Sequence, residues 1–289
     1  MKKNIIILTD SCSMFTAQEA KDNNIGIIPL HIIYQDGTDV LDTEENVIKH
    51  NLYEEITKQE TKTSQSSLGE IEEFFRESLT KAEKVIFIPV ASNLSSQAQT
   101  ALSIAAKDEF KDKIYVLETF MSASTAQKEL ALYGNELIKQ GLDIEVILEK
   151  LKKYSEDTLM YLVPGDLQRF AKGGRGKKLM VNIISFLKIK LAIKWGSEPK
   201  KASSSRKIRN ILEDIFSKLK EDMKKLKHNF EKAKIYFVYN KHCSEKTLNI
   251  IYAFLEENKT NFEESQMPNV VVAHAGLDTF GFIILPETK

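Results

Sequence analysis

The chain alternates short runs of β-branched residues with longer segments of helical periodicity, and this alternation constrains its fold more than any other feature. In the first half, strands are expected at residues 3–8, 26–34, 84–90, 114–118 and 158–163, the second interrupted by Pro29. Helices are expected at residues 43–59, 67–82, 95–107, 122–139 and 143–155. Strands that alternate with helices form βαβ units. The sequence therefore predicts an α/β fold with a mostly parallel sheet flanked by helices.

The second half of the chain has a different pattern, which predicts a smaller α/β domain. Helices are expected at residues 166–172, 177–186, 204–232 and 244–257, and strands at residues 189–195, 234–239 and 279–285. A length of 289 residues fits two domains of ordinary size. We place the boundary after residue 164, which gives an N-terminal α/β domain, 1–164, and a C-terminal α/β domain, 165–289.

The formal net charge is zero, from 41 Lys and Arg against 41 Asp and Glu, but the charges are unevenly distributed. Residues 168–234 contain 20 basic and six acidic residues, so the rest of the chain has an equal acidic excess. Two interpretations stay open: a long solvated helix with a lysine-rich face, or a surface for a polyanion, an acidic partner or an anionic membrane. The neutral total argues against a generic nucleic-acid-binding protein.

The cysteines and the apolar runs indicate the compartment. Two cysteines, Cys12 and Cys243, are too few for a disulfide framework and lack zinc-site spacing. The apolar run at residues 5–8 is too short for the core of a signal peptide. Other apolar runs are also too short to span a bilayer. We expect a soluble, reduced, cytoplasmic protein.

Three polar clusters lie where strands and helices are expected to meet. Asp10 and Ser11 follow the first strand, residues 62–67 are hydroxyl-rich and precede a helix, and Ser92 and Ser95 follow the strand 84–90. Free N–H groups at a helix start, together with hydroxyls, favour a carboxylate or phosphate. The alternative is that these side chains only cap helices. If the second and third clusters converge, they predict one small-anion site above the sheet.

Two further features are candidates for the same site. The glycine-rich turn at residues 172–176 presents Arg175, and His274 lies in an apolar run. The alternative for the turn is an ordinary loop. The histidine is either a core residue or a hydrogen-bonding partner for an anion. The sequence has no dinucleotide or P-loop fingerprint and no HExxH pair, so a nucleotide-dependent enzyme or a metal site has no motif support.

Taken in order, these motifs resemble the pattern of the DegV family over essentially the whole chain. The shared elements are Asp10-Ser11, Thr63-Ser64-Gln65, Ser92-x-Leu94-Ser95, Lys172-Gly173-Gly174-Arg175 and His274-x-Gly276. The chain departs from the usual family pattern at three places. Ser66 replaces a proline, Ser96-Gln97 replaces Gly-Thr, and Leu277-Asp278-Thr279 replaces a glycine-rich segment.

The resemblance implies a two-domain fold with a long-chain fatty acid buried between the domains as its ligand, and no other cofactor. By the same resemblance, Thr63 and Ser92 hold the carboxylate, with Ser64 and Ser95 as neighbours and His274 nearby. The best-understood family members are non-catalytic subunits of bacterial fatty acid kinase. A separate kinase phosphorylates their bound carboxylate with ATP, which feeds phospholipid synthesis.

The resemblance also gives Arg175 a role in contacting the kinase, and the basic segment suits an acidic kinase surface or transient contact with anionic lipid. An acyl chain needs an apolar tunnel, because each buried methylene contributes about 0.8 kcal/mol. Phe120, Met121, Met160 and Phe186 are candidates for its wall.

Two other functions stay open at the level of the sequence. Asp10 at a strand end, beside Ser11 and Ser13, fits a hydrolase or phosphotransferase, although the second acid of an aspartyl-phosphate site is replaced by Cys12. The basic segment fits a nucleic-acid-binding module, which we rank lower because aromatic residues are not interleaved with its charges.

Overall fold

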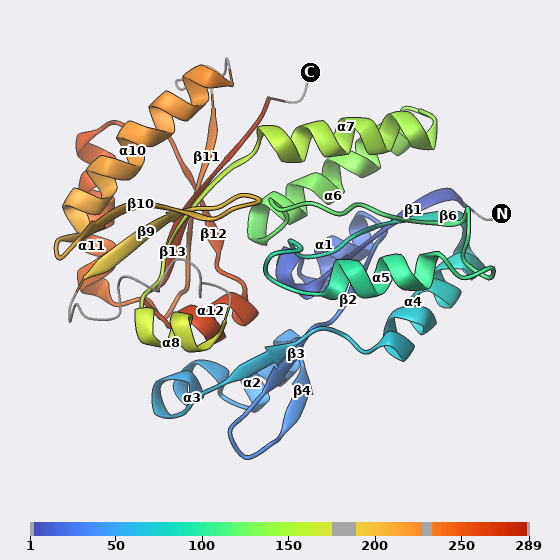
Figure 1. Cartoon of the computed structure of the whole chain (residues 1–289), viewed down its shortest axis with the longest axis horizontal. Helices are drawn as coiled ribbons and strands as arrows, with labels where there is room; N and C mark the ends of the chain where they lie inside the picture. Colours follow the sequence, from blue (N-terminus) through green and yellow to red (C-terminus); the bar gives the residue numbers. More distant parts are fainter. Residues whose placement is uncertain (1–2, 175–188, 227–232, 288–289) are drawn as a thin grey trace.

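The first sheet has four parallel strands in the order β2-β1-β6-β7 (Figure 1). The structure is a computed structural model that describes residues 3–174, 189–226 and 233–287. The strands are β1 (Lys3–Asp10), β2 (Ile25–Ile28), β6 (Ala82–Ile88) and β7 (Ile114–Val116). The accompanying helices are α1 (Ala17–Asp22), α4 (Leu68–Lys81), α5 (Gln97–Ala105), α6 (Ser124–Lys139) and α7 (Ile144–Asp157). The predicted βαβ pattern is confirmed.

Strand β1 is apolar on both faces because helices cover both sides of its sheet. Ile6 and Leu8 pack with α4 and α5, whereas Ile5 and Ile7 pack with α6 and α7. A strand that is buried on both faces has a continuous apolar run instead of alternation. Burial on both faces therefore explains why residues 5–8 are all apolar.

The second sheet has six strands in the order β10-β9-β8-β13-β11-β12, and it is antiparallel except between β11 and β12. Its strands are β8 (Leu159–Val163), β9 (Lys190–Lys194), β10 (Lys200–Ser205), β11 (Lys234–Tyr239), β12 (Glu263–Gln266) and β13 (Phe280–Leu285). Helices α10 (Ile208–Lys225) and α11 (Glu245–Glu257) cover one face. The other face packs against α6, which therefore lies between the two sheets (Figure 1).

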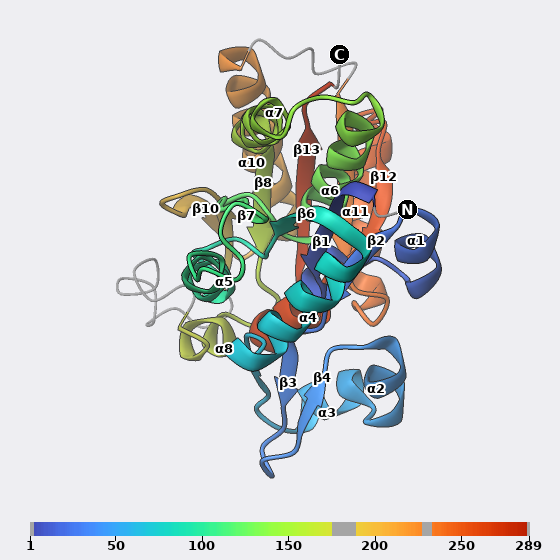
Figure 2. The same cartoon turned by 90° about the vertical axis from the view of Figure 1, so that its right-hand side faces the viewer.

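A small antiparallel sheet, in the order β4-β3-β5, lies beside the other two (Figure 2). It consists of β3 (His31–Ile33), β4 (Asp39–Leu41) and β5 (Lys62–Ser64), with α2 (Glu44–Lys49) and α3 (Leu52–Lys58) between β4 and β5. Helix α12 (Asn269–Ala275) contacts both β5 and α8 (Leu167–Lys172). These contacts bring together three of the sequence motifs. In the described residues, no helix is long and apolar enough to cross a membrane.

The structure corrects three of the predicted elements. The single helix expected at 43–59 is two helices, because Asn51 takes a left-handed conformation with φ of 47°. Asparagine tolerates this conformation better than most residues do. The long helix expected at 204–232 begins at Ile208, and the residues before it form β10. Residues 62–64, expected as part of a loop, form β5. The expected helix 177–186 lies outside the described residues.

The domain boundary after residue 164 stays a prediction. Strand β8 (Leu159–Val163), which we assigned to the first domain, is hydrogen-bonded to β13 and β9 of the second sheet. A boundary drawn by sheet membership therefore falls before β8.

The Asp10 carboxylate joins three elements of the first sheet. It accepts hydrogen bonds from the Cys12 and Val90 backbone N–H groups, at 3.1 and 2.6 Å, and from the Gln127 side chain at 2.9 Å. These donors lie after β1, after β6 and in α6. Asp10 is 0% exposed, and this burial raises its pKa from 3.8 to about 7. The three N–H donors oppose the rise because they stabilise the charged form.

This raised pKa predicts how stability depends on pH. The folded state holds the Asp10 proton more tightly than the unfolded state, so the associated stability is complete below pH ~4 and is lost as the pH rises to ~7. In Asp10→Asn, an NH₂ group replaces one carboxylate oxygen among the N–H donors. A buried N–H donor then has no acceptor, which lowers the free energy of unfolding by about 1–3 kcal/mol. The free energy of unfolding of wild type minus that of Asp10→Asn, measured by urea unfolding, is therefore expected to be larger at pH 5 than at pH 7.5.

Asp108→Asn is the matched control, because Asp108 is exposed. Unfolding free energies of wild type and Asp10→Asn that run parallel between pH 5 and pH 7.5 would show that the Asp10 pKa is not raised.

Candidate functional site

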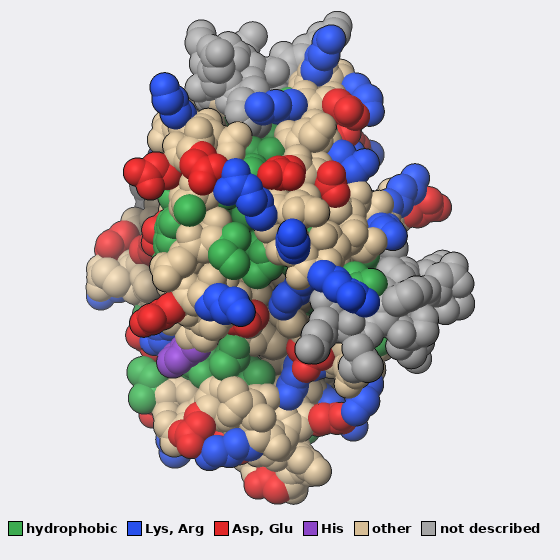
Figure 3. All heavy atoms as spheres, turned by 90° about the vertical axis from the view of Figure 1, so that its left-hand side faces the viewer, with side chains coloured by type: hydrophobic (Ala, Val, Ile, Leu, Met, Phe, Trp, Pro, Cys, Tyr) green, Lys and Arg blue, Asp and Glu red, His purple; other side chains and the backbone are tan. Residues whose placement is uncertain are grey.

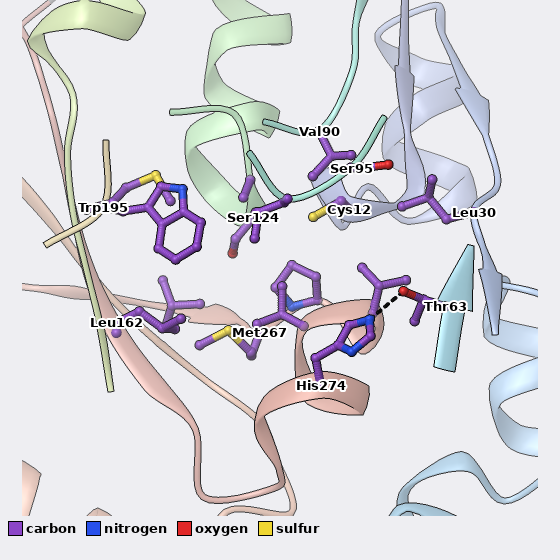
Figure 4. Close-up of a pocket in the computed structure, with 18 of the residues that line it drawn as sticks. Cys12, Leu30, Thr63, Val90, Ser95, Ser124, Leu162, Trp195, Met267 and His274 are labelled. Carbon is purple, nitrogen blue, oxygen red and sulfur yellow. Dashed lines mark hydrogen bonds between the residues drawn. The ribbon is translucent and has the colours of Figure 1, made fainter. Parts of the chain in front are cut away.

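An apolar cavity of about 90 Å³ lies between the first and second sheets (Figure 4). Its walls come from the segments that follow strands of the first sheet, from β5, from the second sheet and from α12. The apolar part includes Leu30, Val90, Met160, Leu162, Val238, Val270, Val271 and Ile283. Met160 thus lies in the wall, as we expected, whereas Phe120 is 40% exposed at the surface. Phe186 lies outside the described residues.

Polar side chains gather at one end of this cavity. Thr63, Ser64, Gln65, Ser95 and His274 all line it, and they come from β5, the turn after β5, the turn before α5 and α12. The Thr63 hydroxyl is 2.6 Å from Nε2 of His274. Figure 4 shows this pair on one side of the view and Trp195 and Leu162 on the other. We call the Thr63–His274 side the polar end of the cavity and the Trp195–Leu162 side its apolar end.

Two glycines position His274. Gly276 ends α12 with φ of +85°, a conformation that residues with a side chain rarely adopt. Gly173 approaches the imidazole so closely that an added Cβ would lie 2.7 Å from Nδ1 of His274. Gly173 of the glycine-rich motif therefore lies directly against the His274-x-Gly276 motif.

The two serine clusters have different environments. Ser95 Oγ lines the cavity and accepts a hydrogen bond from Gln97 N at 3.2 Å. Ser92 Oγ is buried with no hydrogen-bond partner among the described residues, although Ser92 is not part of the cavity wall. Ser64 Oγ donates to the Gln65 carbonyl. A buried hydroxyl without a partner is unusual and keeps its full capacity to donate.

Asp10 and Ser11 are structural groups near this site and do not line the cavity. The Ser11 hydroxyl donates to Asp42 at 2.8 Å, and Asn269 donates to the other oxygen of Asp42 at the same distance. Burial raises the pKa of Asp42. Because Asn269 begins α12, this chain of hydrogen bonds fixes the helix that carries His274 to the end of β1.

Sequence reasoning missed several residues of the wall. Cys12 lines the cavity with a buried thiol whose pKa is raised well above its ordinary value by burial. Trp195, the chain's single tryptophan, is 4% exposed and lines the apolar end. Its indole N–H donates to Asn93 Oδ1 at 3.1 Å, and the Asn93 amide donates to the Gly196 carbonyl at 2.6 Å. The only sequence signal for the Trp195–Asn93 contact was that Asn93 lies within the hydroxyl-rich segment that contains Ser92 and Ser95.

The predicted kinase-contact residue Arg175 lies outside the described residues. The described ranges contain no group of three or more His, Cys, Asp or Glu side chains that could hold a metal ion. Both cysteines are free.

A sequence profile described as "Uncharacterised protein, DegV family" matches residues 4–287. The chain belongs to the DegV family. A DegV domain-containing protein of Mycoplasma genitalium is 26% identical over the full length of both chains. One from Ureaplasma parvum is 25% identical, and the match covers 98% of this chain and 89% of that protein.

Solved DegV-family structures share the fold. A Thermus thermophilus DegV family protein described by its fatty acid binding has a TM-score of 0.83 at 20% identity, and the match covers 98% of this chain and 100% of that one. A stearic acid-binding protein from Eubacterium ventriosum has a TM-score of 0.82 at 17% identity, with 99% and 98% covered. These likenesses confirm the mixed α/β DegV architecture.

Two of the departures from the usual DegV pattern contact each other. Ser66 N donates to Gln97 Oε1 at 3.0 Å, and Gln97 Nε2 donates to Ser66 Oγ at 3.1 Å. A proline at position 66 would have no N–H group and would need no acceptor. Ser66 is 1% exposed and Gln97 is 0% exposed, so their polar groups are shielded from water. Each residue supplies a hydrogen-bond partner for a buried polar group of the other. The two replacements therefore compensate for each other.

This compensation predicts non-additive stability. Gln97→Thr alone leaves the Ser66 N–H without its acceptor and is expected to cost about 1–3 kcal/mol of unfolding free energy. Ser66→Pro with Gln97→Thr is expected to be more stable than the sum of the single changes by about 0.5–3 kcal/mol. Chemical unfolding of the four proteins in this cycle measures the coupling.

Ser96→Gly is the control, because exposed Ser96 makes no side-chain capping hydrogen bond to α5. Its effect is expected to add to that of Ser66→Pro. Strict additivity of Ser66→Pro and Gln97→Thr would contradict the coupling.

Proposed function

We propose that this DegV-family protein binds a long-chain fatty acid, with the acyl chain in the cavity and the carboxylate at the Thr63–His274 end. The observation that carries this proposal is the pairing of Thr63 with His274 at the polar end of an otherwise apolar cavity. The descriptions of two DegV structures and of a further structure with the same fold as fatty-acid-binding proteins support it.

The energetics of each end match a fatty acid. Each buried methylene contributes about 0.8 kcal/mol, so a long chain supplies most of the binding free energy. Burying a carboxylate is unfavourable unless donors meet it. When Nε2 of His274 donates to the Thr63 oxygen, the Thr63 hydroxyl is free to donate to a carboxylate at the cavity wall. The Ser92 hydroxyl lies outside that wall and is unsatisfied among the described residues. Ser64 and Ser95 complete the proposed carboxylate site.

We further propose that the bound carboxylate is presented to a separate cytoplasmic kinase, which phosphorylates it for phospholipid synthesis. The protein then acts as an acyl carrier and not as an enzyme. Arg175 stays the proposed kinase contact, and the basic segment 168–234 stays a proposed surface for the kinase or an anionic membrane. In the described part of that segment, basic side chains form ion pairs with acids, including Lys194–Asp222 at 2.6 Å. Figure 3 shows both signs of charge interspersed on one face.

The hydrolase or phosphotransferase alternative gains no support from the structure. Asp10 is buried, its oxygens accept three N–H groups, and it does not line the cavity. A nucleophile or general base must reach the substrate. We therefore assign Asp10 a structural role.

The carboxylate site is tested by one methyl-for-hydroxyl change. Thr63→Val keeps the shape of the side chain but removes the hydroxyl, and we expect the affinity for palmitate to fall about tenfold, as for a lost hydrogen bond to a charged group. Isothermal titration of delipidated protein measures the affinity. Mass spectrometry of a solvent extract of purified wild type is expected to show a fatty acid.

Thr57→Val is the matched control, because Thr57 is exposed on α3. Wild-type protein that carries no fatty acid and takes up none would overturn the proposed function. Equal palmitate affinity for the Thr63→Val and Thr57→Val variants would remove Thr63 from the carboxylate site.

The direction of the bound chain is tested with the single tryptophan. Because Trp195 lines the apolar end, fatty acids brominated near the methyl end are expected to quench its fluorescence more than those brominated near the carboxylate. Steady-state fluorescence at saturating ligand measures the difference. Stronger quenching by bromine near the carboxylate would place the head at Trp195 and reverse the assignment.

A further inference from the structure

The apolar end of the cavity is formed in part by Trp195, the chain's single tryptophan. Trp195 directly follows β9, and its backbone N–H donates to the Met160 carbonyl of β8 at 2.8 Å. Figure 4 shows the indole and Leu162 on the side of the cavity opposite Thr63 and His274. An acyl chain whose carboxylate lies at the polar end therefore runs toward the indole.

Packing restricts the movement of this indole. Trp195 is 4% exposed and belongs to a buried apolar cluster with Phe170, Leu191 and Ile193. Because protein interiors are close-packed, a buried ring in such a cluster moves only if its neighbours move as well. The part of the cavity wall that Trp195 supplies is therefore rigid.

Hydrogen bonds to Asn93 fix the position of the ring further. The indole N–H donates to Asn93 Oδ1 at 3.1 Å, and Asn93 Nδ2 donates to the Gly196 carbonyl at 2.6 Å. Both ends of the amide are used, so Asn93 holds two successive residues of the turn after β9. A buried indole N–H needs an acceptor. A ligand that displaces the ring therefore has to break this hydrogen bond.

Asn93 also connects the two ends of the cavity. It lies in the turn after β6, two residues before Ser95, which lines the cavity among the polar side chains. The same turn thus contributes a hydroxyl to the polar end and holds Trp195 at the apolar end. Because one turn contacts both ends, the fold sets the distance between them, and the ligand has to match it.

We propose that Trp195 determines the length of the acyl chain that the cavity accepts, and that Asn93 is the positioning residue that holds Trp195 in this role. Methylenes that fit between the polar end and the indole add affinity, whereas further methylenes meet a ring that is held by packing and by hydrogen bonds. This inference rests on the proposed fatty-acid function and adds chain-length specificity to it.

The test is a competition between saturated fatty acids. Delipidated protein is incubated with an excess of laurate, myristate, palmitate, stearate and arachidate in equal amounts. The bound acids are extracted and quantified by mass spectrometry, so that their ratios give relative affinities. In wild type, each methylene that the cavity buries is expected to raise affinity about fourfold. The bound amount is then expected to reach a maximum at one length and to fall for longer acids.

Shortening the side chain at position 195 is expected to move this maximum to a longer acid. In Trp195→Leu, the acid with two more methylenes than the wild-type optimum is expected to gain about tenfold relative to that optimum, because both methylenes are now buried. Trp195→Phe is a milder reduction in size and is expected to shift the ratio in the same direction. It tests the proposal if circular dichroism shows that Trp195→Leu does not fold.

The role of Asn93 has its own variants. In Asn93→Ala the indole is no longer held, and the longer acid is expected to gain about fivefold relative to the wild-type optimum, as for one lost hydrogen bond. Asn93→Asp keeps an acceptor for the indole N–H and is expected to restore the wild-type ratios. A residue needed only for folding would change all affinities by one factor and leave the ratios unchanged.

Phe262→Leu is the matched control, because Phe262 is a partly buried aromatic residue that packs against the core around α10 and α11 and does not line the cavity. It is expected to leave the ratios of bound acids as they are in wild type.

The outcomes separate this inference from the function on which it rests. If wild type binds none of the acids, the proposed function fails. If wild type binds them but the bound amount rises through arachidate, or if the maximum stays in place in the folded Trp195 variants, the length limit is overturned and the fatty-acid function stands. If the maximum moves in the Trp195 variants but not in Asn93→Ala, the positioning role of Asn93 is overturned.

Discussion

The hydrogen bonds that satisfy two buried carboxylates hold the DegV fold in the arrangement that forms its cavity. Asp10 joins the ends of β1 and β6 to α6, and Asp42 joins the small sheet to β1 through Ser11 and to α12 through Asn269. An unpaired buried carboxylate is strongly unfavourable, so each forces its donors to converge. Helix α12 then carries His274 to the edge of β5, where Thr63 meets it. The site depends on these contacts although neither carboxylate lines the cavity.

The same constraint separates the two spaces beside His274. In the proposed function, the apolar cavity would take the acyl chain, because methylenes need no hydrogen-bond partners, and the Thr63–His274 end would bind the carboxylate. A separate polar crevice is also lined by Thr63 and His274, and it contains Arg169, whose guanidinium donates to the Ile56, Gln59 and Ala273 carbonyls. One wall of two residues therefore divides a space that suits hydrocarbon from a space that suits charge.

Much of this arrangement was predictable from the sequence, and the remainder depends on contacts between distant residues. The apolar run of β1 and the strand-helix alternation predicted the parallel sheet, since burial on both faces has a direct sequence signature. The family resemblance predicted one carboxylate site made by Thr63, Ser64, Ser92, Ser95 and His274. All of these except Ser92 line the cavity, and their role in binding stays a prediction. Strand β5 was not predictable, because three polar residues become a strand only by pairing with β3. Trp195 was missed because its position depends on Asn93, about a hundred residues away.

The distribution of charge shows why a sum over the sequence has little functional meaning here. The basic excess of residues 168–234 suggested a basic face. In the described structure, six of the segment's fourteen described basic side chains pair with acids, as Lys172 does with Glu60 and Arg209 with Glu257. Pairing removes most of the field of such side chains beyond a Debye length. Arg169 differs because it is held by carbonyl oxygens, which fix its position without cancelling its charge. Arg169 is therefore a positioned cation close to the Thr63–His274 pair, which the total of 20 basic residues in that segment does not reveal.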